Sequence, residues 1–120
     1  LTHRMLATRE RLDRIAALGN RAGAVVAGLL AFSERFDLAK YGSIGAPLHD
    51  PCTIAWLLKP ELFTGKMINV SIETRSDLTR GMTVADWWQI TDRPRNVHFL
   101  RDGNADGFFA LLTERLARLP

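Results

Sequence analysis

The sequence predicts a mixed α/β fold, with helices around a short pair of strands. Apolar residues recur at helical spacing near both ends of the 120-residue chain, in residues 4–18 and 105–118. Between these segments, residues 68–73 alternate strictly between apolar and polar side chains, which is the pattern of a strand. The order helix, helix, loop, helix, two or three strands and helix favours one α/β layer that is part of something larger.

The first two helices are expected on either side of Gly19-Asn20, a dipeptide that ends helices. The helix over residues 4–18 places its apolar residues roughly on one side: Met5, Leu12, Ile15 and Ala16. The helix over residues 21–38 begins with an almost wholly apolar half, residues 22–32, which we expect to be buried on most sides. The chain offers few other elements to surround it, and this supports an incomplete fold.

A loop of conformationally permissive residues, 41–47, leads to a third helix. Asp50 is expected to cap free backbone N–H groups, and Pro51 takes the first helical position. The helix is expected to run to about Leu58, and Pro60 ends or kinks it.

Three short strands are expected over residues 68–73, 83–90 and 97–100. In the first, one face carries the apolar side chains: Ile68, Val70 and Ile72. A last helix covers about 105–118. Its apolar face holds four side chains: Phe108, Phe109, Leu112 and Leu116.

The composition excludes several classes of protein. Lys plus Arg is 16 and Asp plus Glu is 13, and the charges are scattered without a long run of one sign, which argues against a nucleic-acid-binding module. No stretch approaches 18 apolar residues, so no transmembrane helix is expected. The single cysteine, Cys52, cannot form an internal disulfide, which fits the cytoplasm. The chain lacks a starting Met, which hints at a fragment, a trimmed chain or a processed one.

His49 and Asp50 form the one compact pair of chemically able side chains. They follow the permissive loop and lie at a helix start, a common position for ligand and metal sites. Asp50 offers a hard oxygen ligand suited to Ca²⁺ or Mg²⁺, and His49 can donate a proton near neutral pH. The alternative is a helix cap beside a structural histidine. Ca²⁺ takes roughly six to eight oxygens, so if Asp50 binds Ca²⁺, most ligands must come from elsewhere.

Other residues offer weaker candidates. Cys52 lies in the first turn of a helix, where thiolates are stabilised, so a Cys52–His49 nucleophilic pair is conceivable; a small buried residue is the alternative. Trp87 and Trp88 are adjacent in a predicted strand and would face opposite sides, one in the core and one over an interface or a ligand. His3 and His98 have no suitable partners nearby in sequence.

The segment Gly45-Ala46-Pro47-Leu48-His49-Asp50-Pro51-Cys52 resembles the inosine-uridine nucleoside hydrolase family. The likeness runs along the whole chain, in the correct order, and is nearest to the bacterial pyrimidine-preferring ribonucleoside hydrolases. Further matching stretches are Leu1-Thr2-His3, residues 58–63, 69–74, 81–84 and 91–94, and Asp106-Gly107-Phe108-Phe109.

The resemblance implies that residues 1–120 are the C-terminal part of one open α/β nucleoside hydrolase domain. It implies that Asp50 is a Ca²⁺ ligand, that His49 lies beside the leaving base and helps to protonate it, and that Tyr41 falls in the region that shapes the nucleobase pocket. The family's N-terminal Asp-rich motif, which supplies most metal ligands and the general base, has no counterpart here. The intact protein is therefore expected to cleave ribonucleosides, and the isolated chain is expected to be inactive.

Three hypotheses remain open. The chain is a hydrolase segment from a longer polypeptide or completed by another one, which the motif order favours. It is a non-catalytic remnant that oligomerises through residues 22–32, which the absent metal motif favours. It is a basic nucleic-acid-binding module, which the scattered charge opposes. We expect a homo-oligomer that binds a ribonucleoside and neither a membrane nor nucleic acid.

Overall fold

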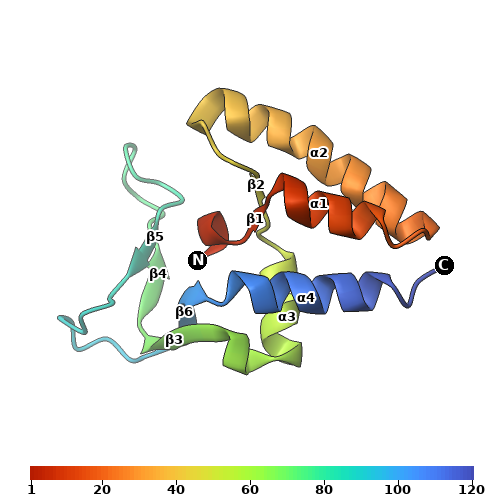
Figure 1. Cartoon of the computed structure of the whole chain (residues 1–120). Helices are drawn as coiled ribbons and strands as arrows, with labels where there is room; N and C mark the ends of the chain where they lie inside the picture. Colours follow the sequence, from red (N-terminus) through yellow and green to blue (C-terminus); the bar gives the residue numbers. More distant parts are fainter. The chain divides into compact units, whose positions relative to one another are not determined.

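The computed structural model describes residues 1–120, which form two compact units. The first unit contains Leu1–Phe63 and Asp102–Pro120, and the second contains Thr64–Arg101. The fold has α-helices and short two-stranded sheets, as the sequence predicts. Its elements, in chain order (Figure 1), are η1 (Thr2–Arg4), β1 (Leu6–Ala7), α1 (Arg9–Ala16), α2 (Arg21–Tyr41), β2 (Ala46–Pro47), α3 (Pro51–Leu58), η2 (Pro60–Leu62), β3 (Phe63–Ile68), β4 (Val70–Ile72), β5 (Thr83–Ala85), β6 (Val97–Gly103) and α4 (Ala105–Leu116).

The core of the first unit lies where α1, α3 and α4 meet the β1–β2 pair. In Figure 1, α1 lies between α2 and α4, and α4 also contacts α3. The largest fully buried side chains of this core are Met5 and Phe108, and the Phe108 ring meets Phe63 and Phe109 edge-to-face. The predicted last helix is confirmed, because Phe108, Phe109 and Leu116 are buried.

The first helix begins later than predicted, at Arg9 instead of residue 4. Met5 is buried as expected, but it lies between η1 and β1 and not on a helix. Leu6 and Ala7 pair with Pro47 and Ala46 in an antiparallel ladder. Helical periodicity in residues 4–8 is therefore overridden by a pairing with a segment forty residues away, which local sequence cannot reveal.

The expectation that α2 is buried on most sides is wrong for this chain. α2 runs from Arg21 to Tyr41, past the predicted end at 38, and stops at Gly42, which has a φ of 64°. It packs against the much shorter α1, which covers one side, so Gly23 is its only buried residue. Four apolar side chains, spaced four, three and four residues apart, are more than half exposed: Val25, Leu29, Phe32 and Phe36.

The second unit is built on strand pairs β3–β6 and β4–β5. The predicted strand over residues 68–73 is divided, because Asn69 is buried between β3 and β4 and its side-chain amide donates to the carbonyl of Pro94. Ile68 is fully buried, whereas Ile72 is 54% exposed, so the two do not share a buried face. The predicted third strand is confirmed and extends to Gly103.

The predicted strand over residues 83–90 is wrong beyond Ala85. Asp86 turns the chain by accepting hydrogen bonds from the backbone of Ile90 and Thr91, so the two tryptophans lie in a turn. Trp87 meets Phe99 edge-to-face, whereas Trp88 is 76% exposed.

Candidate active site

The β1–β2 pair positions the predicted site residues of the first unit. Leu6 pairs with Pro47, and the backbone N–H of Leu48 donates to the carbonyl of Met5 over 3.0 Å. This bond continues the antiparallel ladder by one step. Because the two strands run in opposite directions, the residues before Met5 lie near the residues after Leu48. Met5 and Leu48 are both buried, so this backbone bond is held in the core.

Three aromatic side chains gather at this end of the ladder. The ring centroids of His3 and His49 are 5.7 Å apart with their planes 72° apart, and those of His3 and Tyr41 are 6.4 Å apart at 76°. Both are edge-to-face contacts within the usual distance of aromatic pairs. All three side chains are exposed. The His3 ring thus contacts both His49 and Tyr41, the two residues that the resemblance implies are near the base.

His49 lines a cavity of about 590 Å³ between β2 and the C-terminal half of α2. The other lining residues are Phe32, Ser33, Arg35, Phe36, Asp37 and Pro47. The cavity is therefore lined by two phenyl rings, one positively charged side chain, one negatively charged side chain and the His49 imidazole. His3 and Tyr41 do not line it.

Asp50 precedes α3 as predicted, but its carboxylate makes no capping hydrogen bond. The reason is its backbone, which is already helical at φ −61° and ψ −41°, whereas a capping side chain needs an extended residue. Only the carbonyl of Asp50 is used, as acceptor from the N–H and the hydroxyl of Thr53. Asp50 is exposed and borders a different cavity from His49, one between α3 and α4. The chain alone therefore does not direct both residues into one cavity.

The chain's residues fit a Ca²⁺ ion only in part. The exposed Asp50 carboxylate is a suitable oxygen ligand, since no hydrogen bond or ion pair engages it. No group of three or more His, Cys, Asp or Glu side chains in residues 1–120 is arranged to hold a metal. Because Ca²⁺ needs roughly six to eight oxygens, these residues do not form its site by themselves.

Cys52 does not suit the nucleophile that its helix-start position suggested. It is 2% exposed, and its thiol donates to the carbonyl of Leu48 over 3.2 Å. Burial raises the pKa of the Cys52 thiol. The neutral thiol is therefore favoured, and the alternative interpretation, a small buried residue, is supported.

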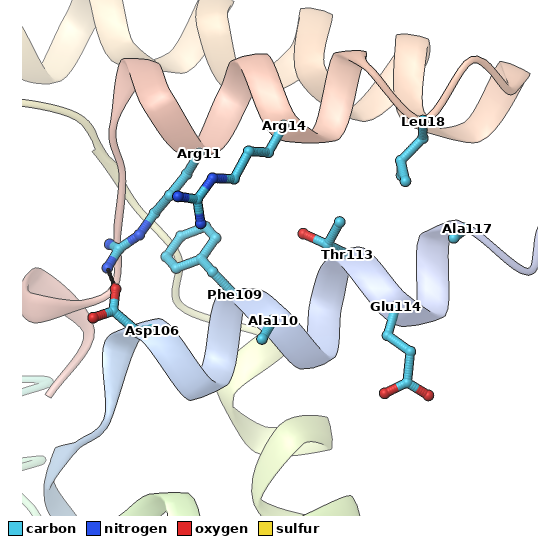
Figure 2. A pocket seen from close by; sticks show the side chains of 9 residues that line it. All are labelled: Arg11, Arg14, Leu18, Asp106, Phe109, Ala110, Thr113, Glu114 and Ala117. Carbon is cyan, nitrogen blue, oxygen red and sulfur yellow. Dashed lines mark hydrogen bonds and ion pairs between the residues drawn. The ribbon is translucent and has the colours of Figure 1, made fainter.

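A third cavity, of about 280 Å³, lies between α1 and α4 (Figure 2). Arg11 extends across it from α1, donates to Asp106 of α4 over 2.7 Å, and places its guanidinium 4.4 Å from the centre of the Phe109 ring. Its other amino group donates to the carbonyl of Leu6. The contacts with Asp106 and Phe109 tie α1 to α4, and the bond to Leu6 ties α1 to β1, so Arg11 is a structural brace.

Sequence reasoning missed His3, because no candidate partner lies near it along the chain. The pairing of residues 6–7 with 46–47 brings it to His49, and a predicted helix from residue 4 obscured that pairing. The available indication was Thr8, a residue type favoured at the N-cap, which is compatible with a helix that begins at Arg9 and leaves Leu6 and Ala7 outside it.

Comparison with known proteins gives one consistent family. The family described as inosine-uridine preferring nucleoside hydrolase matches residues 1–110. A pyrimidine-specific ribonucleoside hydrolase, RihA of Shewanella oneidensis, is 48% identical over 118 residues, 98% of this chain and 37% of its own length. An uncharacterized protein of Schizosaccharomyces pombe is 48% identical over 120 residues, all of this chain and 39% of its own length.

The fold agrees with this assignment. The structure of a purine-preferring ribonucleoside hydrolase from Gardnerella vaginalis superimposes with a TM-score of 0.78 at 23% identity, over 97% of this chain and 37% of that one. The chain belongs to the inosine-uridine preferring nucleoside hydrolase family. It spans somewhat more than a third of the length of the curated relatives it matches. No helix in residues 1–120 is long and apolar enough to cross a membrane.

Proposed function

We propose that residues 1–120 are the C-terminal segment of a single nucleoside hydrolase domain. The complete enzyme hydrolyses the N-glycosidic bond of ribonucleosides to ribose and free base. The observation that carries the proposal is the family match, which extends over residues 1–110 and includes His49 and Asp50. The chain alone is inactive in this proposal, because it holds one carboxylate of a site that needs several.

His49 is the proposed acid that protonates the departing base. Its imidazole is exposed and borders a cavity of about 590 Å³, within the roughly 300–1,000 Å³ that small-molecule sites occupy. Proton donation to a leaving group contributes typically about 10²- to 10⁴-fold to a rate. Tyr41 does not line this cavity, so we propose that it shapes the base site indirectly, through its ring contact with His3 at the end of α2.

Asp50 is the proposed ligand of a Ca²⁺ ion completed by residues outside this chain. Its carboxylate has no partner within residues 1–120, which keeps both oxygens available. A bound Ca²⁺ would have the Asp50 carboxylate as one of its ligands, and it would supply a Lewis acid that makes a bound water more acidic. Asp50 itself holds position at the rigid start of α3, where Pro51 fixes the backbone.

The test of His49 uses an enzyme of complete length, in which this chain replaces the matching 118-residue segment of the Shewanella relative. Uridine is the first substrate, because that relative is named pyrimidine-specific. We expect His49→Ala to lower kcat on uridine by about 10²-fold or more. The same variant should cleave p-nitrophenyl β-D-riboside almost normally, because nitrophenolate departs without protonation. Equal losses on both substrates would contradict the acid role.

The second candidate function is a non-catalytic module that oligomerises. The exposed apolar stripe of α2 (Val25, Leu29, Phe32 and Phe36) favours it, because monomers rarely leave such a stripe uncovered. The molar mass in solution, measured by light scattering over a range of concentrations, discriminates the oligomerising module from the hydrolase segment. A module would form a defined oligomer that Phe32→Glu dissociates, with Ser33→Glu on the same helix as the control. A homo-oligomer of the complete enzyme in the cytoplasm is part of the first proposal.

A further inference from the structure

We propose that His3 is a positioning residue for His49, and that it holds the His49 imidazole in the orientation from which it donates its proton. The inference rests on the proposed function, since it assigns His3 a role in that same site.

The contact with His3 restricts the rotation of the His49 imidazole. His49 is exposed, and no hydrogen bond fixes its imidazole within residues 1–120. An exposed imidazole rotates readily about its terminal side-chain bond, which has a broad, nearly two-fold preference. His3, with its ring centre 5.7 Å from that of His49 and its plane turned by 72°, limits this rotation.

The backbone beneath the two histidines is fixed at several points. Met5 N–H donates to the carbonyl of Thr2, which closes η1 around His3, and Leu48 N–H donates to the carbonyl of Met5. Arg4, the neighbour of His3, forms an ion pair with Asp102. Since Met5 is fully buried, His3 stands on a segment anchored in the core.

His3 supports His49 from outside the proposed base cavity. His49 is among the residues that line that cavity, and His3 is not. His3 also meets the ring of Tyr41, over which the ammonium of Lys40 lies 5.0 Å from the ring centre. The row from Tyr41 through His3 to His49 therefore connects the end of α2 to the start of α3. A proton donor must lie within hydrogen-bond reach of its acceptor, so loss of the support lowers the fraction of productive orientations.

The first arm of the test measures the contact in the 120-residue chain by NMR. The chain has three histidines, so single substitutions assign each ring. We expect a nuclear Overhauser effect between the ring protons of His3 and His49. We also expect a shift of the His49 ring signals in His3→Leu that His98→Leu, in the second unit, does not produce. Absence of both effects would overturn the inference.

The second arm measures turnover in the complete-length enzyme described above. His3→Leu removes the flat ring and keeps an apolar side chain, whereas His3→Phe keeps a ring that can meet His49 edge-to-face. We expect His3→Leu to lower kcat on uridine about tenfold, with KM and the cleavage of p-nitrophenyl β-D-riboside changed less than about twofold. We expect His3→Phe to recover most of the turnover.

The outcomes separate this inference from the function it rests on. If His49→Ala selectively lowers uridine turnover and His3→Leu does not, the acid role stands and the positioning role is wrong. A loss shared equally by both substrates in His3→Leu, at an unchanged melting temperature, also overturns it. If His49→Ala leaves uridine turnover unchanged, the acid role and this inference fail together.

Discussion

Cys52 lies one turn from the proposed catalytic pair, and its environment makes it inert. Its thiol is buried beneath α3 and donates to the carbonyl of Leu48. Because burial raises its pKa, the thiolate fraction at pH 8 is smaller than in the unfolded chain. We expect alkylation by iodoacetamide to be at least about tenfold slower in the native chain than in urea. Equal rates in the two conditions would show that the thiol is accessible.

Asp86 orders the turn that carries the two tryptophans. Hydrogen bonds from the Thr91 hydroxyl and from the backbone of Thr91 and Ile90 hold the pKa of Asp86 below its ordinary value. The turn is therefore stabilised above the ordinary carboxyl pKa, and this contribution is lost as the pH falls through the lowered folded value. We expect the amides of Ile90 and Thr91 to exchange faster with solvent in Asp86→Ala at pH 6. Asp92→Ala is the control, and protection that Asp86→Ala leaves intact would contradict the assignment.

At the residue scale, the sequence allowed the start of α3 to be predicted better than the geometry of the side chains around it. The start of α3 at Pro51 follows from residue preferences alone, and it is observed. The free carboxylate of Asp50 depends on a helical φ and ψ that no residue type dictates. The contact between His3 and His49 depends on chain pairing over more than forty residues, so it required the structure.

At the scale of elements, the β1–β2 ladder is the feature on which the candidate site depends. A Cβ on Gly45 would lie 2.7 Å from the carbonyl oxygen of Ala7 and would force the ladder apart. We expect Gly45→Ala to lower the free energy of unfolding by about 1–3 kcal/mol, measured by urea denaturation. It should also weaken the contact between His3 and His49.

Gly28 provides the matched control on α2. A Cβ there meets nothing within 4 Å, and the position is inside a helix. Gly28→Ala should therefore raise the stability by about 0.5–1 kcal/mol. If both substitutions had the same effect, the close approach at Gly45 would not be the cause.

Secondary structure was predicted correctly where the local sequence pattern determines it. It was predicted wrongly where pairing with a distant segment determines it. The apolar spacing of α4 was read correctly because its buried face, with Phe108 and Phe109, is continuous along one helix. The strand at Leu6–Ala7 was missed because its partner is distant. The hydrophobicity of α2 was read correctly, but its burial was not, because no element of this chain covers the stripe that includes Phe32.

At the scale of the whole molecule, three observations support the proposal that residues 1–120 are a segment of a larger domain. The curated relatives are more than twice as long as the segment they share with this chain. The apolar stripe of α2 is uncovered, and Asp50 belongs to no group of three or more side chains that could hold a metal. The proposed larger domain would account for all three, since its remainder would supply a covering surface and further oxygen ligands.

The most direct measurement compares the 120-residue chain with the complete-length enzyme for Ca²⁺ binding, by calorimetry, and for uridine cleavage. We predict no binding tighter than about millimolar and no cleavage for the chain alone, and both activities for the complete enzyme. Asp50→Ala in the complete enzyme should abolish both, whereas Asp92→Ala should preserve them. Cleavage by the chain alone, or activity and Ca²⁺ affinity that survive Asp50→Ala, would contradict the account.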